Sequence, residues 1–496
     1  MAQNVVRGWI ALAALALATL TIGLDVTVLT VALPTLAVDL DAGTSALQWF
    51  STAYTLVLAG AMLPAGSLGD RFGRKRLLVG ALVVFGVASV ACSFADSPGQ
   101  LIAARGFLGL GAAVMIPLSI AVVPVLFSEA TQRERAIAIW VAAAALGLPL
   151  GPILGGWLLN HFWWGSVFLI NIPLVVIGAA AVIAFVPESR SSTRAPIDAL
   201  GVVLSSAGLL CLTYGFIRAG QQGWGERVST GALAVGLLVL AVFVVWQSRA
   251  ANPLIDLGLF RSRGFVTGSV FVAVGMFTLY GLLFVLPQYF QAVLGADAFG
   301  SGLRLVPMMA GLIVGTKVAD SLREARGARV VLIAGFVLLG VAGGLGATTS
   351  VDTAYWVTAM WTALVGAAMG FVMPTALGMA VGSVSVDKAG AGSAVIQVFR
   401  QVGGTIGAAV LPSVVAAGYA SGLGEFDVAP IRDNVTVGVA LGAGNPDMVA
   451  RVQSSFVSGM ALMLWLCMGM CVVSVLVASF LSPGRVPMVE ASESVR

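Results

Sequence analysis

The sequence predicts an all-α integral membrane protein with about fourteen transmembrane helices. Charged residues make up 10% of the chain, hydrophobic residues make up 59%, and the mean hydropathy is +1.01. A soluble globular protein carries about 25% charged residues, so this composition excludes a soluble fold. Short polar turns separate long apolar runs, and each bilayer crossing needs roughly 20 apolar residues.

Two polar connections, Pro187–Pro196 and Ser248–Gly264, divide the apolar runs into three groups. The first group predicts an N-terminal six-helix bundle in residues 1–190, with spans at 8–33, 46–69, 77–95, 99–127, 136–159 and 166–186. The middle group predicts an inserted helix pair in 191–250, with spans at 198–219 and 229–247. The last group predicts a C-terminal six-helix bundle in 251–496, with spans at 265–291, 301–319, 330–348, 354–382, 390–419 and 455–481.

The last two spans are joined by a long outer loop, 420–454. Its apolar stretch Val435 to Leu441 is expected to fold back on the membrane surface.

Basic residues predict the orientation in the membrane. Most of the 26 Lys and Arg residues fall on alternate connections, starting from the N-terminus. Such connections stay in the cytoplasm, so both termini are expected there, which requires an even number of spans. Arg far outnumbers Lys, as in GC-rich bacteria, so we expect a bacterial protein. With its many predicted spans, we expect it to be a multi-pass protein of the inner (cytoplasmic) membrane. The net charge of +4 follows from this sidedness and does not indicate nucleic-acid binding.

Two ionisable residues lie deep in apolar runs. Asp25 is the only charge between Gly8 and Val38. A carboxylate at that depth costs on the order of 2.5–3.5 kcal/mol, which indicates a function. Arg105 needs an acceptor, and Asp25 is the only mid-membrane acid that the sequence offers. We therefore predict a site that binds a proton or a cation in turn. The alternatives are a neutral structural carboxyl at Asp25, and interfacial anchoring or a structural bond to a carbonyl for Arg105.

Small residues follow one face of the predicted fifth span. Gly147, Gly151 and Gly155 repeat at four-residue intervals, which lets another helix pack closely. Pro149 and Pro152 add a bend. We expect this face to seal a cavity in one conformation and to slide in the other; plain structural packing is the alternative.

An acidic residue followed by a basic cluster occurs twice at corresponding places. Asp70 precedes Arg71, Arg74 and Lys75 between the second and third spans, and Asp320 precedes a similar cluster in the second bundle. This recurrence indicates a parallel repeat of the two bundles. For the first cluster, a plain loop that only sets the orientation is the alternative.

Several motifs now agree in order and position, and together the chain resembles a fourteen-helix drug:proton antiporter of the major facilitator superfamily. The resemblance implies a multidrug efflux transporter that is driven by the proton gradient and has no catalytic centre, metal or other cofactor. It also implies roles for individual residues: Asp25 and Arg105 in proton coupling or cation binding, Asp70, Arg71, Arg74 and Asp320 in gating, and Gly147, Gly151, Pro152, Gly155 and Gly156 in the antiporter motif. The motifs that carry the resemblance lie in the segments Leu24–Pro34, Gly66–Leu77, Leu101–Ala113, Gly147–Gly156 and Trp163–Pro173.

Polar and aromatic residues suggest the substrate. Trp49, Tyr54, Tyr280, Gln288 and Gln397 are candidates for the cavity wall, where aromatic rings suit lipophilic cations; aromatic belt or core positions are the alternative. Some relatives carry acids in the thirteenth span, where this chain has Gln397, Arg400 and Gln401, which argues against dicationic substrates.

The predicted function is therefore proton-coupled export of lipophilic, preferentially cationic drugs or antibiotics by alternating access. A same-fold transporter dedicated to one endogenous metabolite or self-made antibiotic is the alternative. The expected partners are small molecules, protons and membrane lipid, with no nucleic acid, and the expected working unit is a monomer. A single His and no clustered catalytic residues argue against an enzyme.

Overall fold

The computed structural model describes residues 2–127, 129–190, 198–222, 225–250, 253–255, 257–383 and 389–480. Within the helices, some side chains also lie outside the described part, among them those of Asp70 and Pro149. The described residues form helices and no strand.

The helices follow one another with short connections. The first group, α1–α7, comprises α1 (Ala2–Asp39), α2 (Thr44–Phe72), α3 (Arg74–Ser93), α4 (Pro98–Leu126), α5 (Ala130–His161), α6 (Ser166–Leu169) and α7 (Asn171–Phe185). The pair α8 (Ala199–Gln222) and α9 (Arg227–Gln247) follows. The last group, α10–α18, comprises α10 (Arg263–Gln288), α11 (Ala298–Leu303), α12 (Val306–Arg326), α13 (Ala328–Ala347), α14 (Tyr355–Gly382), α15 (Ala389–Gly422), α16 (Ala429–Asp433), α17 (Val435–Leu441) and α18 (Pro446–Ser479), with short 3-10 and π turns between some of them.

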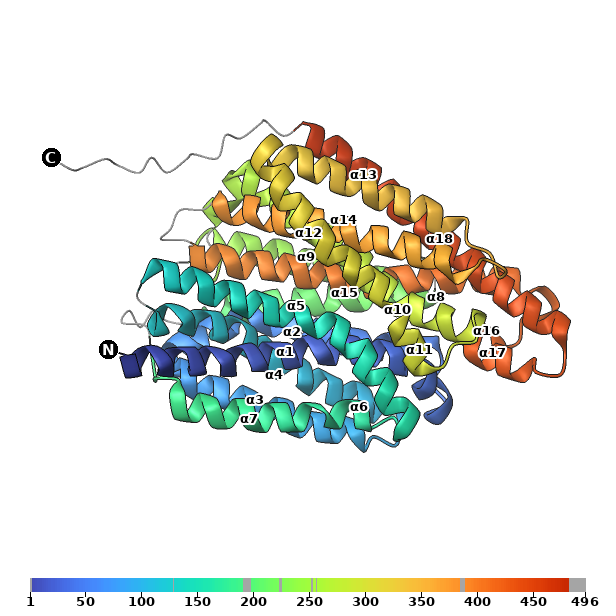
Figure 1. The fold of residues 1–496 in the computed structure, drawn as a ribbon, viewed down its shortest axis with the longest axis horizontal. Helices are drawn as coiled ribbons and strands as arrows, with labels where there is room; N and C mark the ends of the chain where they lie inside the picture. Colours follow the sequence, from blue (N-terminus) through green and yellow to red (C-terminus); the bar gives the residue numbers. More distant parts are fainter. Residues whose placement is uncertain are drawn as a thin grey trace.

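The two groups lie side by side, and α8 packs on both of them. In the first group α1 contacts α5 and α7, and α2 and α3 contact α4. In the last group α15 contacts α10 and α18, and α14 contacts α12 and α13. The groups meet through α2 with α15, α5 with α11 and α1 with α10, while α8 packs on α9, α2 and α15. The beginning of α1 and the end of α18 lie at the same end of the bundle (Figure 1).

Following the predicted orientation, we call that end the inner end and the opposite end, with α11, α16 and α17, the outer end. Twelve helical segments of the described chain are long and apolar enough to cross a membrane. Two further predicted spans correspond to α2 and α5, which contain residues outside the described part. The count of fourteen stays a prediction.

The outer connection before the last span is shorter than predicted. We expected a loop over 420–454, but α15 continues to Gly422 and α18 already begins at Pro446. A proline in the first turn and the side chain of Asn445, which accepts a hydrogen bond from the Met448 N–H at 3.2 Å, start that helix early.

The stretch Val435–Leu441 forms α17, which Asn434 caps, and packs on α18. Gly438 faces Tyr419 and Val452, while Leu441 is exposed. The predicted position of this stretch on the membrane surface stays a prediction.

The glycine face of α5 packs directly on α1. A Cβ atom at Gly147 would lie 2.8 Å from two backbone atoms of Gly23, and one at Gly151 would lie 2.9 Å from the Val28 nitrogen. The Thr27 hydroxyl donates a hydrogen bond to the Gly147 carbonyl at 3.1 Å. This contact holds the segment of α1 that carries Asp25.

We predict that Gly147→Ala lowers the stability of the protein, because a methyl group there forces α1 and α5 apart. Overpacking of this kind costs about 1–3 kcal/mol. The measurement is the midpoint of thermal unfolding of the purified protein in detergent. Gly80→Ala on α3 is the control, because nothing lies within 4 Å of a Cβ at that position. Equal midpoints for the two variants would contradict the close contact.

Candidate functional site

A buried ion pair connects α1 and α4. The side chain of Asp25 is 0% exposed and that of Arg105 is 1% exposed. An Arg105 terminal nitrogen donates a hydrogen bond to Asp25 Oδ2 at 2.5 Å. Such a pair is costly to desolvate, and removing one partner leaves an uncompensated charge in a low-dielectric interior. The two mid-membrane charges that the sequence singled out thus lie in direct contact.

Further groups surround the guanidinium of Arg105. Its Nε donates a hydrogen bond to the Phe50 carbonyl of α2 at 2.9 Å. The ring centroids of Tyr54 and Phe168 lie 4.5 and 5.9 Å from its central carbon, within the range of cation–π attraction. Arg105 therefore ties α1, α2, α4 and α6 together.

Asn171 holds the other oxygen of Asp25. This residue begins α7, and its side-chain amide donates to Asp25 Oδ1 at 3.0 Å and to the Ser89 hydroxyl of α3 at 3.2 Å. Asn171 lies in the segment Trp163–Pro173 that carries the family resemblance, but no role was predicted for it. The available signal was a polar side chain at the start of an otherwise apolar span. Because its partner Asp25 is distant in sequence, that signal did not indicate the contact.

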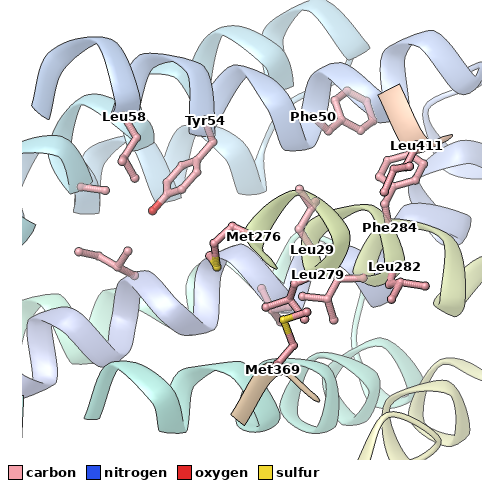
Figure 2. Packing of buried hydrophobic residues seen from close by; sticks show 14 of the residues in the cluster. Leu29, Phe50, Tyr54, Leu58, Met276, Leu279, Leu282, Phe284, Met369 and Leu411 are labelled. Atoms are coloured by element: carbon pink, nitrogen blue, oxygen red, sulfur yellow. The ribbon is translucent and has the colours of Figure 1, made fainter. Parts of the chain in front are cut away.

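A small hollow lies beside the ion pair, between the two helix groups. We call it the central hollow; Tyr54, Thr30 and Arg105 line it from the first group, and Tyr280, Phe284 and Ala408 line it from the last. Figure 2 shows Tyr54 projecting from α2 into the apolar interior, where buried residues of both groups, such as Leu58 and Met276, are drawn. The structure thus brings the predicted residues Tyr54, Tyr280 and Arg105 to one place.

The other predicted cavity residues lie elsewhere. Trp49 packs on Tyr214 of α8, with ring centroids 6.0 Å apart, and so faces the inserted pair. Gln288 donates to the Phe284 carbonyl and lines a second hollow toward the outer end. Gln397 is half-buried on α15. Spacing along a helix could not reveal which neighbour each side chain meets.

The antiporter motif on α5 continues into a closed contact at the outer end. A Cβ atom at Gly156 would lie 2.5 Å from the Phe299 Cα, and one at Gly302 would lie 2.3 Å from the Pro152 carbonyl oxygen. Near them the Asn160 amide donates to Asp297 at 2.5 Å. We call this contact between α5 and α11 the outer seal. The sequence analysis missed Asn160 and Asp297.

Asp297 is ionised within the outer seal. The amide of Asn160 and then the Gly300 N–H donate to its carboxylate and lower its pKa. Two more hydrogen bonds join the groups at the outer end, from Gln291 to the Val31 carbonyl and from Gln48 to the Ser413 hydroxyl. Together with the close contact between α5 and α11, these hydrogen bonds close the space between the groups at the outer end.

The predicted inner loop is anchored by a carboxylate that the sequence analysis did not name. Glu188 lies 3.6 Å from the Arg76 Nε and accepts a hydrogen bond from the Lys75 N–H. Gly73, with a φ of 111°, allows the turn and leaves room for Glu188. Arg74 donates to the Ala121 carbonyl of α4 at 2.9 Å. These contacts hold α3 against its own group.

The other predicted gating residues show local contacts or lie outside the described part. Arg71 is exposed beside the Phe72 ring. Asp320 is exposed and pairs with Arg323 one turn along α12, at 2.9 Å. The Asp70 side chain lies outside the described residues. The predicted gating role of these residues stays a prediction.

Comparisons with known proteins agree with this architecture. The Major Facilitator Superfamily model matches residues 15–408. The tetracenomycin C resistance and export protein of Streptomyces glaucescens is 32% identical, over 96% of this chain and 91% of that protein. The multidrug efflux pump LfrA of Mycolicibacterium smegmatis is 35% identical, over 84% and 82%. The cephamycin export protein CmcT of Amycolatopsis lactamdurans is 37% identical, over 81% and 84%.

Solved structures show the same fold. A bacterial homologue of the human lysosomal transporter Spinster, in an inward-facing and unoccupied conformation, aligns with a TM-score of 0.66 at 16% identity, covering 95% of this chain and 97% of that one. The chain belongs to the Major Facilitator Superfamily, its relatives include named drug and antibiotic efflux proteins, and it is a membrane transporter rather than an enzyme.

Proposed function

We propose that this protein exports lipophilic compounds in exchange for protons, by alternating access and without a cofactor. The buried Asp25–Arg105 pair at the wall of the central hollow carries the proposal. A buried ionisable pair inside a membrane protein is expensive and marks proton or ion pathways. The names of the relatives support export.

Protonation of Asp25 is the coupling step. A proton on Asp25 removes the negative charge that compensates Arg105. The guanidinium then keeps only the Phe50 carbonyl and the ring faces of Tyr54 and Phe168. The link between α1 and α4 weakens, so the proton favours a different arrangement of these helices. A ligand shifts such an equilibrium by its difference in affinity for the two states.

The outer seal gives the direction of the first step. Because the groups are joined at the outer end, the compound enters the central hollow from the inner side or from the bilayer. Export then requires that α5 separates from α11. The α5 helix also packs on α1, so opening of the outer seal and movement of Asp25 are mechanically linked.

The partners of the Asp25 carboxylate bear on the charge of the substrate. A preference for cations followed from an open carboxylate at Asp25, but Arg105 and Asn171 occupy both of its oxygens. Asp25 in this conformation has no oxygen free for a cationic compound. The dedicated transporter of one metabolite or self-made antibiotic remains the second candidate, because two relatives are named for the export of single compounds, tetracenomycin C and cephamycin.

We predict that Asp25→Asn abolishes proton exchange and also destabilises the fold, because it leaves Arg105 buried without a counter-charge. The cost of breaking a buried pair is about 3–5 kcal/mol. The double variant Asp25→Asn with Arg105→Gln removes both charges and should recover most of the stability without recovering exchange. Thermal unfolding in detergent reports stability. Loss of an imposed pH gradient in proteoliposomes, upon addition of neutral, cationic and acidic lipophilic compounds, reports exchange.

The double variant separates coupling from folding. A folded double variant that still dissipates the pH gradient in response to a compound would show that another group carries the proton. Wild-type protein that transports only with ATP would contradict proton coupling altogether.

We predict that Asp297→Ala opens the outer seal more often, because α11 loses its bond to Asn160 and its N-terminal cap. A cysteine introduced at Thr30 in the central hollow, in a background without the four native cysteines, reports access. A membrane-impermeant maleimide added to intact cells should label this cysteine several-fold faster in the Asp297→Ala variant than in the protein that keeps Asp297. Asp352→Ala, at another exposed acid on an outer connection, is the control. Equal labelling rates would show that this bond does not limit opening.

The same seal has a defined pH dependence. The pKa of Asp297 is lowered in the closed form. The stabilisation of the outer seal by ionised Asp297 is therefore complete at neutral pH, and it is lost only as the external pH falls through that lowered pKa.

A further inference from the structure

Arg400 is a second cation near the central hollow, and it has no carboxylate partner in the described part of the chain. It lies on α15, half-buried, in a span whose polar neighbours are amides. Its Nε is shielded from solvent and has no hydrogen-bond partner. The fully buried Arg105, by contrast, pairs with Asp25 and donates to a backbone carbonyl. The contrast makes Arg400 the unexplained charge of the site.

The position of Arg400 on α15 directs it toward the central hollow. Arg400, Gly404 and Ala408 repeat at four-residue intervals and so share one helix face. Ala408 lines the hollow, and the Tyr280 ring lies against Gly404. The Arg400 guanidinium lies near the phenol groups of Tyr280 and Tyr54, which line the hollow as well.

A second donor at this place also lacks an acceptor. The hydroxyl of Tyr54, which lines the hollow and is 0% exposed, has no hydrogen-bond partner. Buried donors without partners are uncommon and costly. Asp25, the carboxylate closest to the hollow among those described, is already engaged by Arg105 and Asn171. Arg400 and the Tyr54 hydroxyl therefore offer a positive charge and a donor that no described carboxylate satisfies.

We propose that Arg400 and the Tyr54 hydroxyl bind an ionised oxygen of the transported compound, so that the preferred substrates are aromatic molecules with an acidic group. Tyr280 and Phe284 supply the apolar wall for the ring system. The guanidinium prefers an oxygen anion, to which it donates charge-assisted hydrogen bonds. The proposal rests on the transport function above and names its substrate class, which is the opposite in charge of the one that the sequence favoured.

Binding of two probes that share a ring system tests the proposal. 1-Anilinonaphthalene-8-sulfonate carries an ionised acidic group, and N-phenyl-1-naphthylamine is the same aromatic amine without it. Fluorescence titration of the purified protein in detergent, corrected for detergent alone, gives both affinities. Arg400→Gln should weaken binding of the sulfonate about ten- to hundredfold and leave binding of the neutral amine unchanged. Arg400→Lys should recover part of the loss.

Two further variants keep the result interpretable. Tyr54→Phe removes a hydroxyl that has no partner in the structure, so it should preserve stability and weaken sulfonate binding several-fold. Arg227→Gln removes an exposed guanidinium at the start of α9 and should change neither affinity. Retained binding of the neutral amine shows that a variant is folded. If Arg400→Gln unfolds the protein, the affinities of Arg400→Lys and Tyr54→Phe for the sulfonate still test the proposal.

The proposal is overturned if the wild type binds the two probes equally, or if the Arg400 and Tyr54 variants bind the sulfonate as the wild type does. Bound lipid phosphate is the other source of an ionised oxygen. In that case the sulfonate competes with added phosphatidylglycerol but drives no loss of the pH gradient in proteoliposomes. Because the titration uses no gradient, Arg400-dependent binding without any proton exchange would uphold this site and reject the proposed antiport.

Discussion

The contact between Asp25 and Arg105 is the constraint on which the rest of the first helix group depends. Two opposite charges that are almost fully buried are tolerated only while each has its partners. Asn171 and the Phe50 carbonyl supply the remaining hydrogen bonds, so the pair fixes α1, α2, α4 and α7 relative to one another. A single proton changes this balance, because it neutralises one partner and not the other. Few other changes of one charge could affect so many helices.

The α5 helix connects this pair to the outer end of the bundle. Its glycine face meets α1 at Gly23 and Val28, on either side of Asp25, and its outer end meets α11 through Pro152 and Gly156. Glycine allows both contacts without side chains in between, so displacement at one contact is passed on to the other and is not absorbed by rotamer changes. This explains why small residues recur along α5, where any larger residue would separate the backbones. The seal and the charged pair therefore belong to one mechanical unit.

The sequence predicted the elements well and the contacts unevenly. Hydropathy places spans reliably because a bilayer demands apolar runs of fixed length, but it does not predict where a helix begins within a polar stretch, as α18 does at Pro446. Asp25 and Arg105 could be paired from sequence because Asp25 was the only mid-membrane acid that the sequence offered to Arg105. Asn171 and Glu188 could not, since their partners are remote in sequence and polar residues at span ends are common. Trp49 and Tyr54 lie less than two turns apart on α2, yet the first faces α8 and the second faces the central hollow.

The distribution of charge sets a condition on how exchange can work. Protonation of Asp25 leaves Arg105 uncompensated beside a hollow that already has Arg400 nearby, so electrostatics alone would favour an acidic compound and a proton together. That is the opposite of exchange. The two ligands must therefore be separated by conformation and not by competition for one carboxylate. The geometry permits this, because Asp25 lies in the first helix group and Arg400 in the last. In the proposed cycle the groups rotate about the central hollow, so Arg400, the proposed site of the compound, moves relative to Asp25, the proposed site of the proton. The shape that binds one ligand tightly then differs from the shape that binds the other, which is the thermodynamic requirement for coupling two sites with opposite sign.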